Sequence, residues 1–455
     1  MDKKIFNIQN LFLILAIFWG SLFILINPPF QAPDEDAHFF KMYGYTEGSF
    51  SFKKENNYTG QILPENFIKL QKFYDLLKFD SDIKTSPQEL ASASTVQLEK
   101  NKTQFFRFIP TGYTPLSYFP SFIIMFLMKF LNFTPISMIF ILRFCSLLTY
   151  LAMCYFALKI TPVHKLLFFT VFMLPLNLYQ AGAISTDGIT SGLVFLFIAY
   201  TLKLKFSENS KLTKKETGIW GLLITLICIC KYTYIPLIFL YFIIPVEKFE
   251  NKKAYLKEFL KFLFLNIFII LIFVYYVITI YSNTKYELAD KTVDKSILIK
   301  FIITHPVQYL KMIFLTLSKL HRFYINNMIS SFGWNSAMVP IFVSNLFYVL
   351  LLCSVFFKDL KEKSLFYHLK DKAVFLFSGI LIFLATITSV YLIYQKSPII
   401  TGVQGRYLFP LIPMFFILFS SYKYNLQNKI IPILVIGFMQ ILLFISVLTL
   451  ILRFY

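Results

Sequence analysis

The sequence predicts an all-α, polytopic membrane protein, as its composition and the lengths of its apolar segments indicate. Of the 455 residues, 57% are hydrophobic and 15% are charged, and the mean hydropathy is +0.64. Many windows reach the roughly 20 apolar residues with which a helix crosses a bilayer. We therefore expect a single integral membrane domain, residues 1–455, with about eleven transmembrane helices and a range of roughly 10–13.

The expected spans follow from the apolar runs and from the basic residues between them. The spans are predicted at 10–27, 136–158, 164–181, 188–203, 217–231, 233–246, 259–281, 338–357, 372–395, 406–422 and 430–452. Lysines gather in alternate connections, at 159–165, 203–215, 248–257, 358–372 and 423–429. Because cytoplasmic loops are enriched in Lys and Arg, we expect these connections and the N-terminus in the cytoplasm, and the C-terminus outside.

Two of the outer connections are long. The first, 28–135, is expected to carry amphipathic helices, and the second large one is 282–337. By hydropathy alone 116–133 would be a further span, but counting it would place the basic loop 203–215 outside. It is therefore expected to lie in or against the outer interface. The polar stretch 81–94 is expected to be flexible.

The net charge of +20 does not indicate a nucleic-acid-binding protein. The lysines fall in loops, where membrane topology requires them, and do not form one basic face. The expected partners are membrane lipids and a lipid-borne substrate, with no nucleic acid. The five cysteines fall inside predicted spans, which is typical of small buried hydrophobic residues.

An acidic cluster follows directly on the first predicted span. Asp34, Glu35 and Asp36 are consecutive, and His38 lies one turn after Asp34. Acids are costly near hydrocarbon, so a cluster at the boundary favours chemistry on a lipid-borne substrate. The same acids would also complement the positive end of a helix beginning at Pro33, and from these residues alone both interpretations stay open. If Mg²⁺ or Mn²⁺ binds, Asp34, Asp36 and His38 are the expected ligands.

Other polar residues fall on the same predicted outer side. Arginine presents a bidentate fork to phosphate oxygens, so Arg107, Arg143 and Arg406 are candidates for binding a lipid phosphate. Asp187 lies at the mouth of the fourth predicted span and is a candidate second acid. Four further residues are expected to line the site: Tyr113, Gln404, Tyr407 and Trp334. The structural alternatives are an interface anchor for Arg406, a helix cap for Asp187 and an aromatic-belt residue for Trp334.

Three motifs resemble those of a bacterial membrane family of unknown function, domain of unknown function 2142. They are PPFQAPDEDAH at 28–38, GYTPLSY at 112–118 and QGRYLFP at 404–410. That family is similar to the GT-C superfamily of glycosyltransferases, which use polyprenyl-phosphate-linked sugars and carry an acidic motif in the first outer loop.

The resemblance implies roles for individual residues and a GT-C-like fold. Asp34 and Glu35 match the first acidic motif, Asp187 the second acid, and Arg406 a phosphate-binding arginine. Family members often have an acid after a tryptophan where this chain has Asn335 after Trp334, so no acid is carried over at that place.

The sequence therefore predicts a GT-C-like glycosyltransferase at the outer face of a bacterial inner membrane. It would move a sugar from a polyprenyl-phosphate-linked donor to a cell-envelope glycan or lipid acceptor. Asp34 is expected to act as general base, with Glu35 and Asp187 as the other catalytic acids. The alternatives are a transporter or flippase of lipid-linked saccharides and an assembly scaffold for them. No internal repeat of the kind common in transporters is visible in the sequence.

Overall fold

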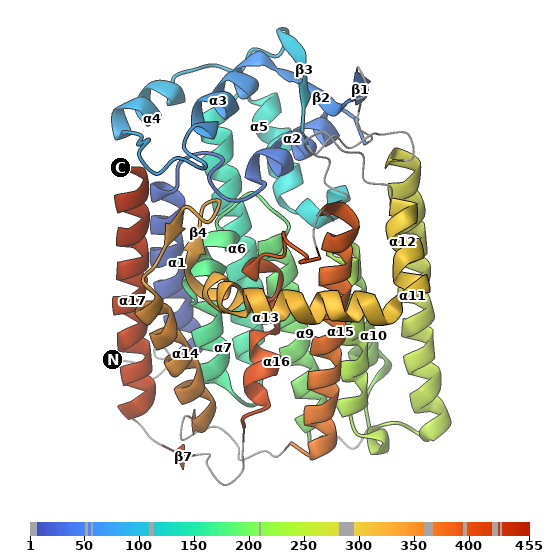
Figure 1. Cartoon of the computed structure of the whole chain (residues 1–455). Coiled ribbons are helices and arrows are strands. Elements are labelled where there is room, and N and C mark those ends of the chain that lie inside the picture. The colour runs from blue at the N-terminus through green and yellow to red at the C-terminus, as the bar shows by residue number, and fades with distance from the viewer. Residues whose placement is uncertain are drawn as a thin grey trace.

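A bundle of upright helices with a cap over one end makes up the fold (Figure 1). The computed structural model describes residues 7–50, 53–55, 58–108, 113–208, 211–281, 295–358, 367–394, 398–420, 426–427 and 430–455. The beginning of the second predicted outer loop, 282–294, and the predicted basic residues Lys3 and Lys4 lie outside the described residues.

Among the described residues, six helices are long and apolar enough to cross a membrane. They are α1 (Ile8–Ile26), α6 (Pro135–Ile160), α9 (Asp187–Phe206), α11 (Lys252–Tyr281), α15 (Leu369–Tyr394) and α17 (Ile430–Phe454). The number becomes seven if a bent pair, α12 and α13, counts as one span. A helical membrane protein is thus confirmed, but a count of about eleven spans is not.

The other five predicted spans are short or broken. They form α7 (Lys165–Phe172) with α8 (Pro175–Ala181), α10 (Lys214–Cys230), the 3-10 helix η2 (Tyr232–Ile243), α14 (Ile341–Phe356), and η4 (Gly405–Tyr407) with η5 (Phe409–Leu411) and α16 (Ile412–Ile417). Prolines account for three of the irregularities. Pro175 begins α8, Pro236 lies inside η2, and Pro413 lies in the first turn of α16, and none of them can donate a main-chain hydrogen bond.

The described residues of the basic connections lie at the end of the bundle opposite the cap (Figure 1). Lys205 at the end of α9 lies 2.8 Å from the carboxylate of Asp371 at the start of α15. Lys248 donates to the carbonyl of Leu204 at 2.6 Å. The grouping of these connections on one face agrees with the alternation that the sequence predicts, whereas the cytoplasmic location of that face stays a prediction.

The C-terminus lies at the capped end (Figure 1). The main-chain N–H of Thr85 in the cap donates to the carbonyl of Phe454 at 2.8 Å, and Arg453 donates to the carbonyl of Asp80 at 2.9 Å. α1 runs from the lower part of the bundle toward the cap (Figure 1).

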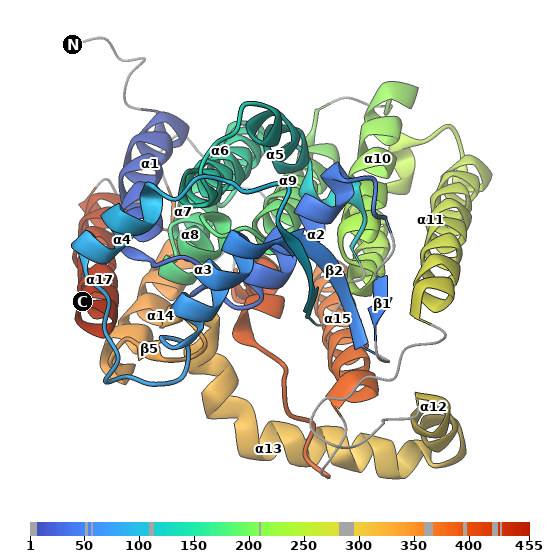
Figure 2. The same cartoon turned by 90° about the horizontal axis from the view of Figure 1, so that it is seen from above.

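The cap is formed by the first predicted outer loop. Its helices are α2 (Glu35–Thr46), α3 (Glu65–Asp75), α4 (Pro87–Ser94), η1 (Pro115–Tyr118) and α5 (Ser121–Phe130). An antiparallel sheet of β1 (Lys53–Glu55), β2 (Tyr58–Pro64) and β3 (Thr103–Arg107), absent from the prediction, completes it. Figure 2 shows α2, α3 and this sheet lying across the bundle.

Two details of the cap bear on the predictions. At 1.5 Å per residue, the ten residues of α5 extend for only about 15 Å, and the helix packs on α2, so 116–133 is not a span. The stretch 81–94, whose expected flexibility stays a prediction, contains α4. Ser86 and Glu89 form a capping box there. The main-chain N–H of Glu89 donates to the hydroxyl of Ser86 at 3.2 Å, and the main-chain N–H of Ser86 donates to the carboxylate of Glu89 at 3.0 Å.

The second predicted outer loop contains two helices, α12 (Lys295–Thr304) and α13 (Pro306–Ser330), which meet at an angle of 102°. α13 runs across the bundle, roughly perpendicular to the upright helices (Figures 1 and 2). Two short hairpin strands, β4 (Ser331–Phe332) and β5 (Ala337–Met338), follow it. A parallel pair, β6 (Phe357–Lys358) and β7 (Leu426–Gln427), lies at the far end of the bundle.

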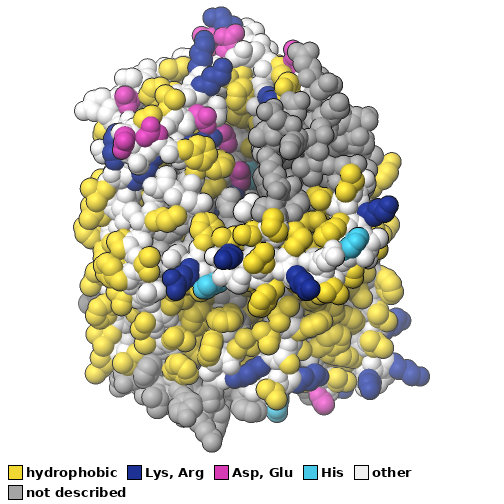
Figure 3. Space-filling view, viewed as in Figure 1, with side chains coloured by type: hydrophobic (Ala, Val, Ile, Leu, Met, Phe, Trp, Pro, Cys, Tyr) yellow, Lys and Arg dark blue, Asp and Glu magenta, His cyan; other side chains and the backbone are white. Residues whose placement is uncertain are grey.

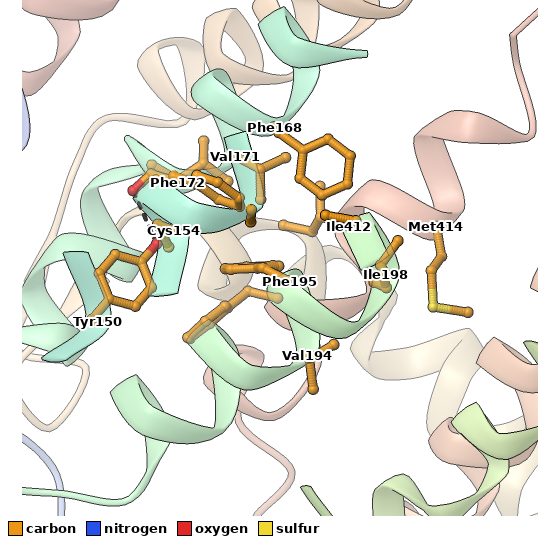
Figure 4. Close-up of a cluster of buried hydrophobic side chains, with 14 of the residues drawn as sticks. Tyr150, Cys154, Phe168, Val171, Phe172, Val194, Phe195, Ile198, Ile412 and Met414 are labelled. Atoms are coloured by element: carbon orange, nitrogen blue, oxygen red, sulfur yellow. Dashed lines mark hydrogen bonds between the residues drawn. The ribbon is translucent and has the colours of Figure 1, made fainter. Parts of the chain in front are cut away.

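A packed apolar core fixes the helix that begins with Asp187. Side chains of α6, α7, α9 and α16 interdigitate there (Figure 4). The rings of Phe172 and Phe195 lie 4.8 Å apart, and Tyr150 donates to the carbonyl of Phe172 at 3.1 Å. Dense packing of this kind resists displacement, so the N-terminus of α9 is held firmly beneath the cap.

Candidate functional site

The acidic run opens helix α2, and its three carboxylates have three different partners. Asp34 binds Arg406, Glu35 binds Arg143, and the carboxylate of Asp36 lies 2.7 Å from Nζ of Lys78. The side chains of the three acids are 40%, 0% and 15% exposed in that order. Asp34 is therefore the acid of the run that is most accessible to a substrate.

The main chain of Asp34 is unusual. Its φ of 64° and ψ of 8° place it in the left-handed region, immediately before α2 begins, and its side chain makes no capping hydrogen bond. Helix capping therefore does not explain this residue. A left-handed conformation costs a non-glycine residue roughly 1–2 kcal/mol, and Asp tolerates it better than most. The contact with Arg406 helps to hold the conformation.

Glu35 and Arg143 form a fully buried ion pair. Nε and Nη2 of Arg143 donate to the two carboxylate oxygens of Glu35 at 2.8 and 2.6 Å. The other N–H groups of Arg143 donate to the carbonyls at positions 24, 27 and 28, at 3.4, 2.6 and 2.8 Å. Because all five donors of the guanidinium are used, two predictions need correction. Arg143 is not placed to bind a phosphate, and Glu35 is not placed to act on a substrate.

Asp36 belongs to a polar cluster inside the cap. Lys78 contacts the carboxylates of both Asp36 and Asp75, at 2.7 and 2.8 Å, and its Nζ lies 4.9 Å from the ring centroid of Trp334. Phe79 contacts Trp334 as well, edge to face at 5.7 Å. Asp36 and Trp334 thus join the cap to the hairpin after α13, which is a structural role.

Arg406 brings the remaining acids together. Its Nη2 binds the carboxylate of Asp34, and its Nη1 donates to Asp187 at 3.2 Å and to the carbonyl of Pro33 at 2.9 Å. Nζ of Lys231, between α10 and η2, lies 3.5 Å from the other carboxylate oxygen of Asp187. We call Asp34, Asp187, Lys231 and Arg406 the Asp34–Arg406 cluster. Asp34 is its exposed member, because the side chains of the other three are at most 12% exposed.

The loop that carries Arg406 is fixed from two sides. The N–H of Gly405 donates to the side-chain oxygen of Asn327 in α13 at 2.7 Å, and a Cβ on Gly405 would lie 2.3 Å from the main chain of Asn327. Only glycine fits at such a distance. On the other side, Tyr234 donates to the carbonyl of Tyr407 at 2.6 Å, and Nζ of Lys231 lies 4.4 Å from the ring centroid of Tyr407.

Neutral side chains of the cap border the cluster. Nδ1 of His38 lies 2.7 Å from the hydroxyl of Tyr118, and the His38 ring lies 5.4 Å from that of Tyr113. Burial lowers the pKa of His38 to about 4, although the carboxylates of Asp34 and Asp187 oppose the shift. Burial and then Asp187 raise the pKa of Tyr113 well above its usual value. Both groups are therefore uncharged near neutral pH.

The metal site expected at Asp34, Asp36 and His38 is not formed. Asp34 binds Arg406, Asp36 binds Lys78, and His38 contacts Tyr118. In the part of the chain that the structure describes, no group of three or more His, Cys, Asp and Glu side chains is placed to hold a metal ion. The residues proposed as ligands thus do not fit a divalent cation.

The remaining predicted site residues divide into two groups. Tyr407 and Tyr113 lie beside the Asp34–Arg406 cluster, and the carbonyl of Gln404 accepts the N–H of Tyr407 at 3.0 Å. Arg107 lies on β3 in the cap, where its guanidinium stacks 3.8 Å above the ring centroid of Tyr58. We therefore do not include Arg107 among the phosphate-binding residues.

Sequence reasoning did not identify Lys231 as a site residue, although a signal for it exists. Lys231 is the one charged residue in the apolar segment 217–246. The topology already requires the chain to turn near this residue on the outer side. A lysine at such a turn lies on the same face as Asp34 and Asp187, so it could have been added to the candidates.

The comparisons with known proteins give one match. The model of a family described as a predicted membrane protein (DUF2142) matches residues 17–415. The matched range includes all four members of the Asp34–Arg406 cluster. No curated protein and no solved structure matches the chain. Because the family model covers well over half of the residues, the chain belongs to this family.

Proposed function

Starting from its membership of the DUF2142 family, we propose that the protein is a GT-C-like glycosyltransferase that takes its sugar from a polyprenyl-phosphate-linked donor. One observation carries the proposal. A partly exposed carboxylate, Asp34, is held by a buried arginine that also binds a second acid, Asp187, at the capped end of a membrane helix bundle. A base and phosphate-binding cations are thereby available together where a lipid-borne substrate would present its head group.

The charges of the cluster suit such a substrate. Asp34 and Asp187 carry two negative charges, and Arg406 and Lys231 carry two positive ones. A donor phosphate would compete with the carboxylates for Arg406 and would release Asp34 to face the acceptor. Because the site is largely buried, charge on the departing phosphate would be stabilised by Arg406 and Lys231 more strongly than in water.

The proposed reaction is a single displacement. The acceptor hydroxyl attacks the anomeric carbon while its proton moves to Asp34, and the bond from that carbon to the phosphate oxygen breaks. The polyprenyl phosphate leaves with the electron pair of that bond and remains beside Arg406. Attack from the side opposite the phosphate inverts the anomeric configuration. A product with retained configuration would contradict this step.

The test is mass spectrometry of surface glycans and polyprenyl-phosphate sugars in a bacterial deletion strain complemented with variants. We expect wild type to restore a missing sugar, and Asp34→Asn or Arg406→Lys to fail while the lipid-linked donor accumulates. Asp36→Asn is the matched control, since it removes a charge from the same run but outside the cluster, and it should restore the sugar. Full restoration by Asp34→Asn, at equal expression, would overturn the proposal.

A transporter of lipid-linked saccharides is the second candidate, and the break at Lys231 favours it. Discontinuous helices with charged residues at the break are typical of transporter binding sites, and Lys231 lies between α10 and the proline-containing η2. Purified protein in vesicles distinguishes the two candidates. Movement of a lipid-linked sugar across the bilayer that persists in Asp34→Asn would indicate transport, whereas sugar transfer without movement would indicate the enzyme.

A further inference from the structure

The cap contains a cavity that is separate from the Asp34–Arg406 cluster. It lies between the C-terminal end of α2 and the sheet of β1, β2 and β3, and its volume is about 500 Å³. Sites for small ligands typically measure roughly 300–1,000 Å³, so the cavity has the size of a binding site. The polar side chains in its walls include those of Tyr43, Glu47, Lys53, Gln61, Lys100 and Thr103.

Helix α2 connects the cluster to the cavity. Asp34 precedes the first residue of α2, whereas Tyr43 and Glu47 lie at its other end. At 1.5 Å per residue the two ends of the helix are about 18 Å apart, so one sugar ring does not reach both places. The cap stands above the apolar band of the surface and presents many charged side chains (Figure 3). The cavity therefore belongs to the part of the molecule outside the apolar band.

Gln61 is the unusual residue of the cavity. It lies on the inward side of β2 with Leu63, and the two residues are 2% and 0% exposed, whereas Ile62 between them is 41% exposed. Its Nε2 is buried and has no hydrogen-bond partner among the described residues. A buried amide without a partner destabilises a fold, and a leucine here would instead join the apolar cluster that contains Leu63. Packing alone therefore does not account for Gln61.

Gly44 gives the amide of Gln61 its place. Gly44 lies inside α2, and a Cβ at this position would lie 2.0 Å from Oε1 of Gln61. Glycine is less favourable than alanine in the interior of a helix. Two residues that each lower stability thus meet at the wall of one cavity, which is the pattern of a site kept for a ligand.

The charge of the walls indicates which ligand fits. Lys53 and Lys100 line the cavity together with one acid, Glu47, whose carboxylate is already bound by Lys129 at 2.6 Å. Lys100 donates to an uncharged acceptor, the carbonyl of Lys129, at 2.6 Å. The walls therefore carry more positive than negative charge, and a cleft of this kind attracts an anion.

We propose that this cavity binds an acidic saccharide, with Nε2 of Gln61 donating to a sugar oxygen and Lys53 and Lys100 binding its carboxylate or phosphate group. The choice of an anion follows from the walls, whereas the choice of a saccharide rests on the proposed function. The acceptor glycan of the transferase would extend from the cavity to Asp34. Binding of this remote part would position the acceptor hydroxyl at the reacting centre.

The experiment measures binding directly. The probe is the surface glycan of the deletion strain, cut into oligosaccharides and separated by anion exchange into an acidic and a neutral fraction. Isothermal titration calorimetry with the purified protein in detergent should show saturable binding of the acidic fraction, at least about tenfold tighter than that of the neutral one. Gln61→Leu should weaken this binding about fivefold through loss of one hydrogen bond, and Lys53→Gln about tenfold through loss of a charged one.

Two further variants separate binding from folding. Gln61→Leu should unfold at a detergent fraction equal to or above that of wild type, since it removes an unpaired buried amide. Gly44→Ala displaces the same amide without changing Gln61, so it should also weaken binding. Gln104→Leu is the matched control, because Gln104 is exposed on the neighbouring strand β3 and should not affect binding.

Three results would overturn the proposal: no saturable binding of the acidic fraction, equal binding of the neutral fraction, or wild-type affinity in both Gln61→Leu and Gly44→Ala. Asp34→Asn should bind the fraction as wild type does, because Asp34 lies at the other end of α2. If Asp34→Asn restores the missing sugar while binding still depends on Gln61, the transferase is wrong and the cavity stands. If binding does not depend on Gln61 while sugar transfer requires Asp34, the reverse holds.

Discussion

Replacing Glu35 with glutamine tests the assignment of the Glu35–Arg143 pair as a structural anchor. The substitution keeps the size and shape of the side chain and removes only its charge. The amide oxygen of the new side chain would still accept a hydrogen bond from the N–H of Ile184, which donates to Glu35 at 3.1 Å. Arg143 would keep its three carbonyl acceptors, but its charge would lose the carboxylate that faces it.

The magnitude follows from the burial of the pair. Both side chains are 0% exposed, so water cannot replace the lost partner. Removing one member of a buried ion pair typically costs about 3–5 kcal/mol, because the remaining charge is left uncompensated. The carbonyls at positions 24, 27 and 28 offset part of this cost, so we expect Glu35→Gln to lower the free energy of unfolding by about 3 kcal/mol.

The assay is unfolding by titration with sodium dodecyl sulfate in mixed micelles, followed by circular dichroism. Glu65→Gln is the matched control, because Glu65 pairs with Lys69 at 3.3 Å on the exposed surface of α3, where an ion pair contributes about 0.5 kcal/mol or less. The double variant Glu35→Gln with Arg143→Met should recover stability relative to Glu35→Gln, since it removes the uncompensated charge. If Glu35→Gln unfolds at the same detergent fraction as wild type, the anchor assignment is wrong.

Two further changes probe the surroundings of the cluster. Gly405→Ala should lower the free energy of unfolding by about 1–3 kcal/mol, because the added Cβ would collide with the main chain of Asn327. Thermal unfolding measures this effect. Gly437→Ala is the control: its Cβ meets no atom within 4 Å, so the substitution should be neutral or slightly stabilising. The pKa of His38 is about 4 in the folded protein, against 6.5 for an unperturbed histidine. The buried neutral ring therefore makes its full contribution to the free energy of unfolding above pH 6.5, and about 3 kcal/mol of that contribution is lost as the pH falls to 4. His38→Gln should show less acid destabilisation over this interval than wild type or the exposed control His305→Gln, and equal pH profiles would refute the argument.

The sequence predicts the membrane class and the arrangement of the connections because both depend on composition. Hydropathy and the placement of lysines are properties of single segments, and the described residues of the basic connections lie at one end of the bundle, as expected. The number of spans is harder to predict, because α16 and η2 owe their irregular form to Pro413 and Pro236 and to their packing against neighbours. An apolar run shows that a segment is buried or in lipid, but not whether it crosses.

The candidate site was predicted in part. Asp34, Asp187 and Arg406 come together, as the shared outer side of their segments suggested. The partners of Glu35 and Arg143 could not be predicted, because a pairing across more than a hundred residues depends on how α1, α2 and α6 pack. Sequence position also cannot separate a buried arginine with all donors occupied from one that faces a ligand.

The three neighbouring acids Asp34, Glu35 and Asp36 have different partners, and this explains how one short segment can both anchor α2 and supply a site residue. Glu35 and Asp36 lie in the first turn of α2 and point about 100° apart, whereas Asp34 precedes the helix in a left-handed conformation, so the three carboxylates face different partners. Glu35 fixes α2 to the bundle through Arg143, and Asp36 fixes it to the cap through Lys78. With the helix held by these two pairs, Asp34 can remain in a strained left-handed conformation beside Arg406. Loss of the fully buried Glu35–Arg143 pair should therefore displace Asp34 without touching it, which makes Glu35→Gln a probe of the site as well as of the fold. Asp36→Asn is milder, because Lys78 keeps its pair with Asp75.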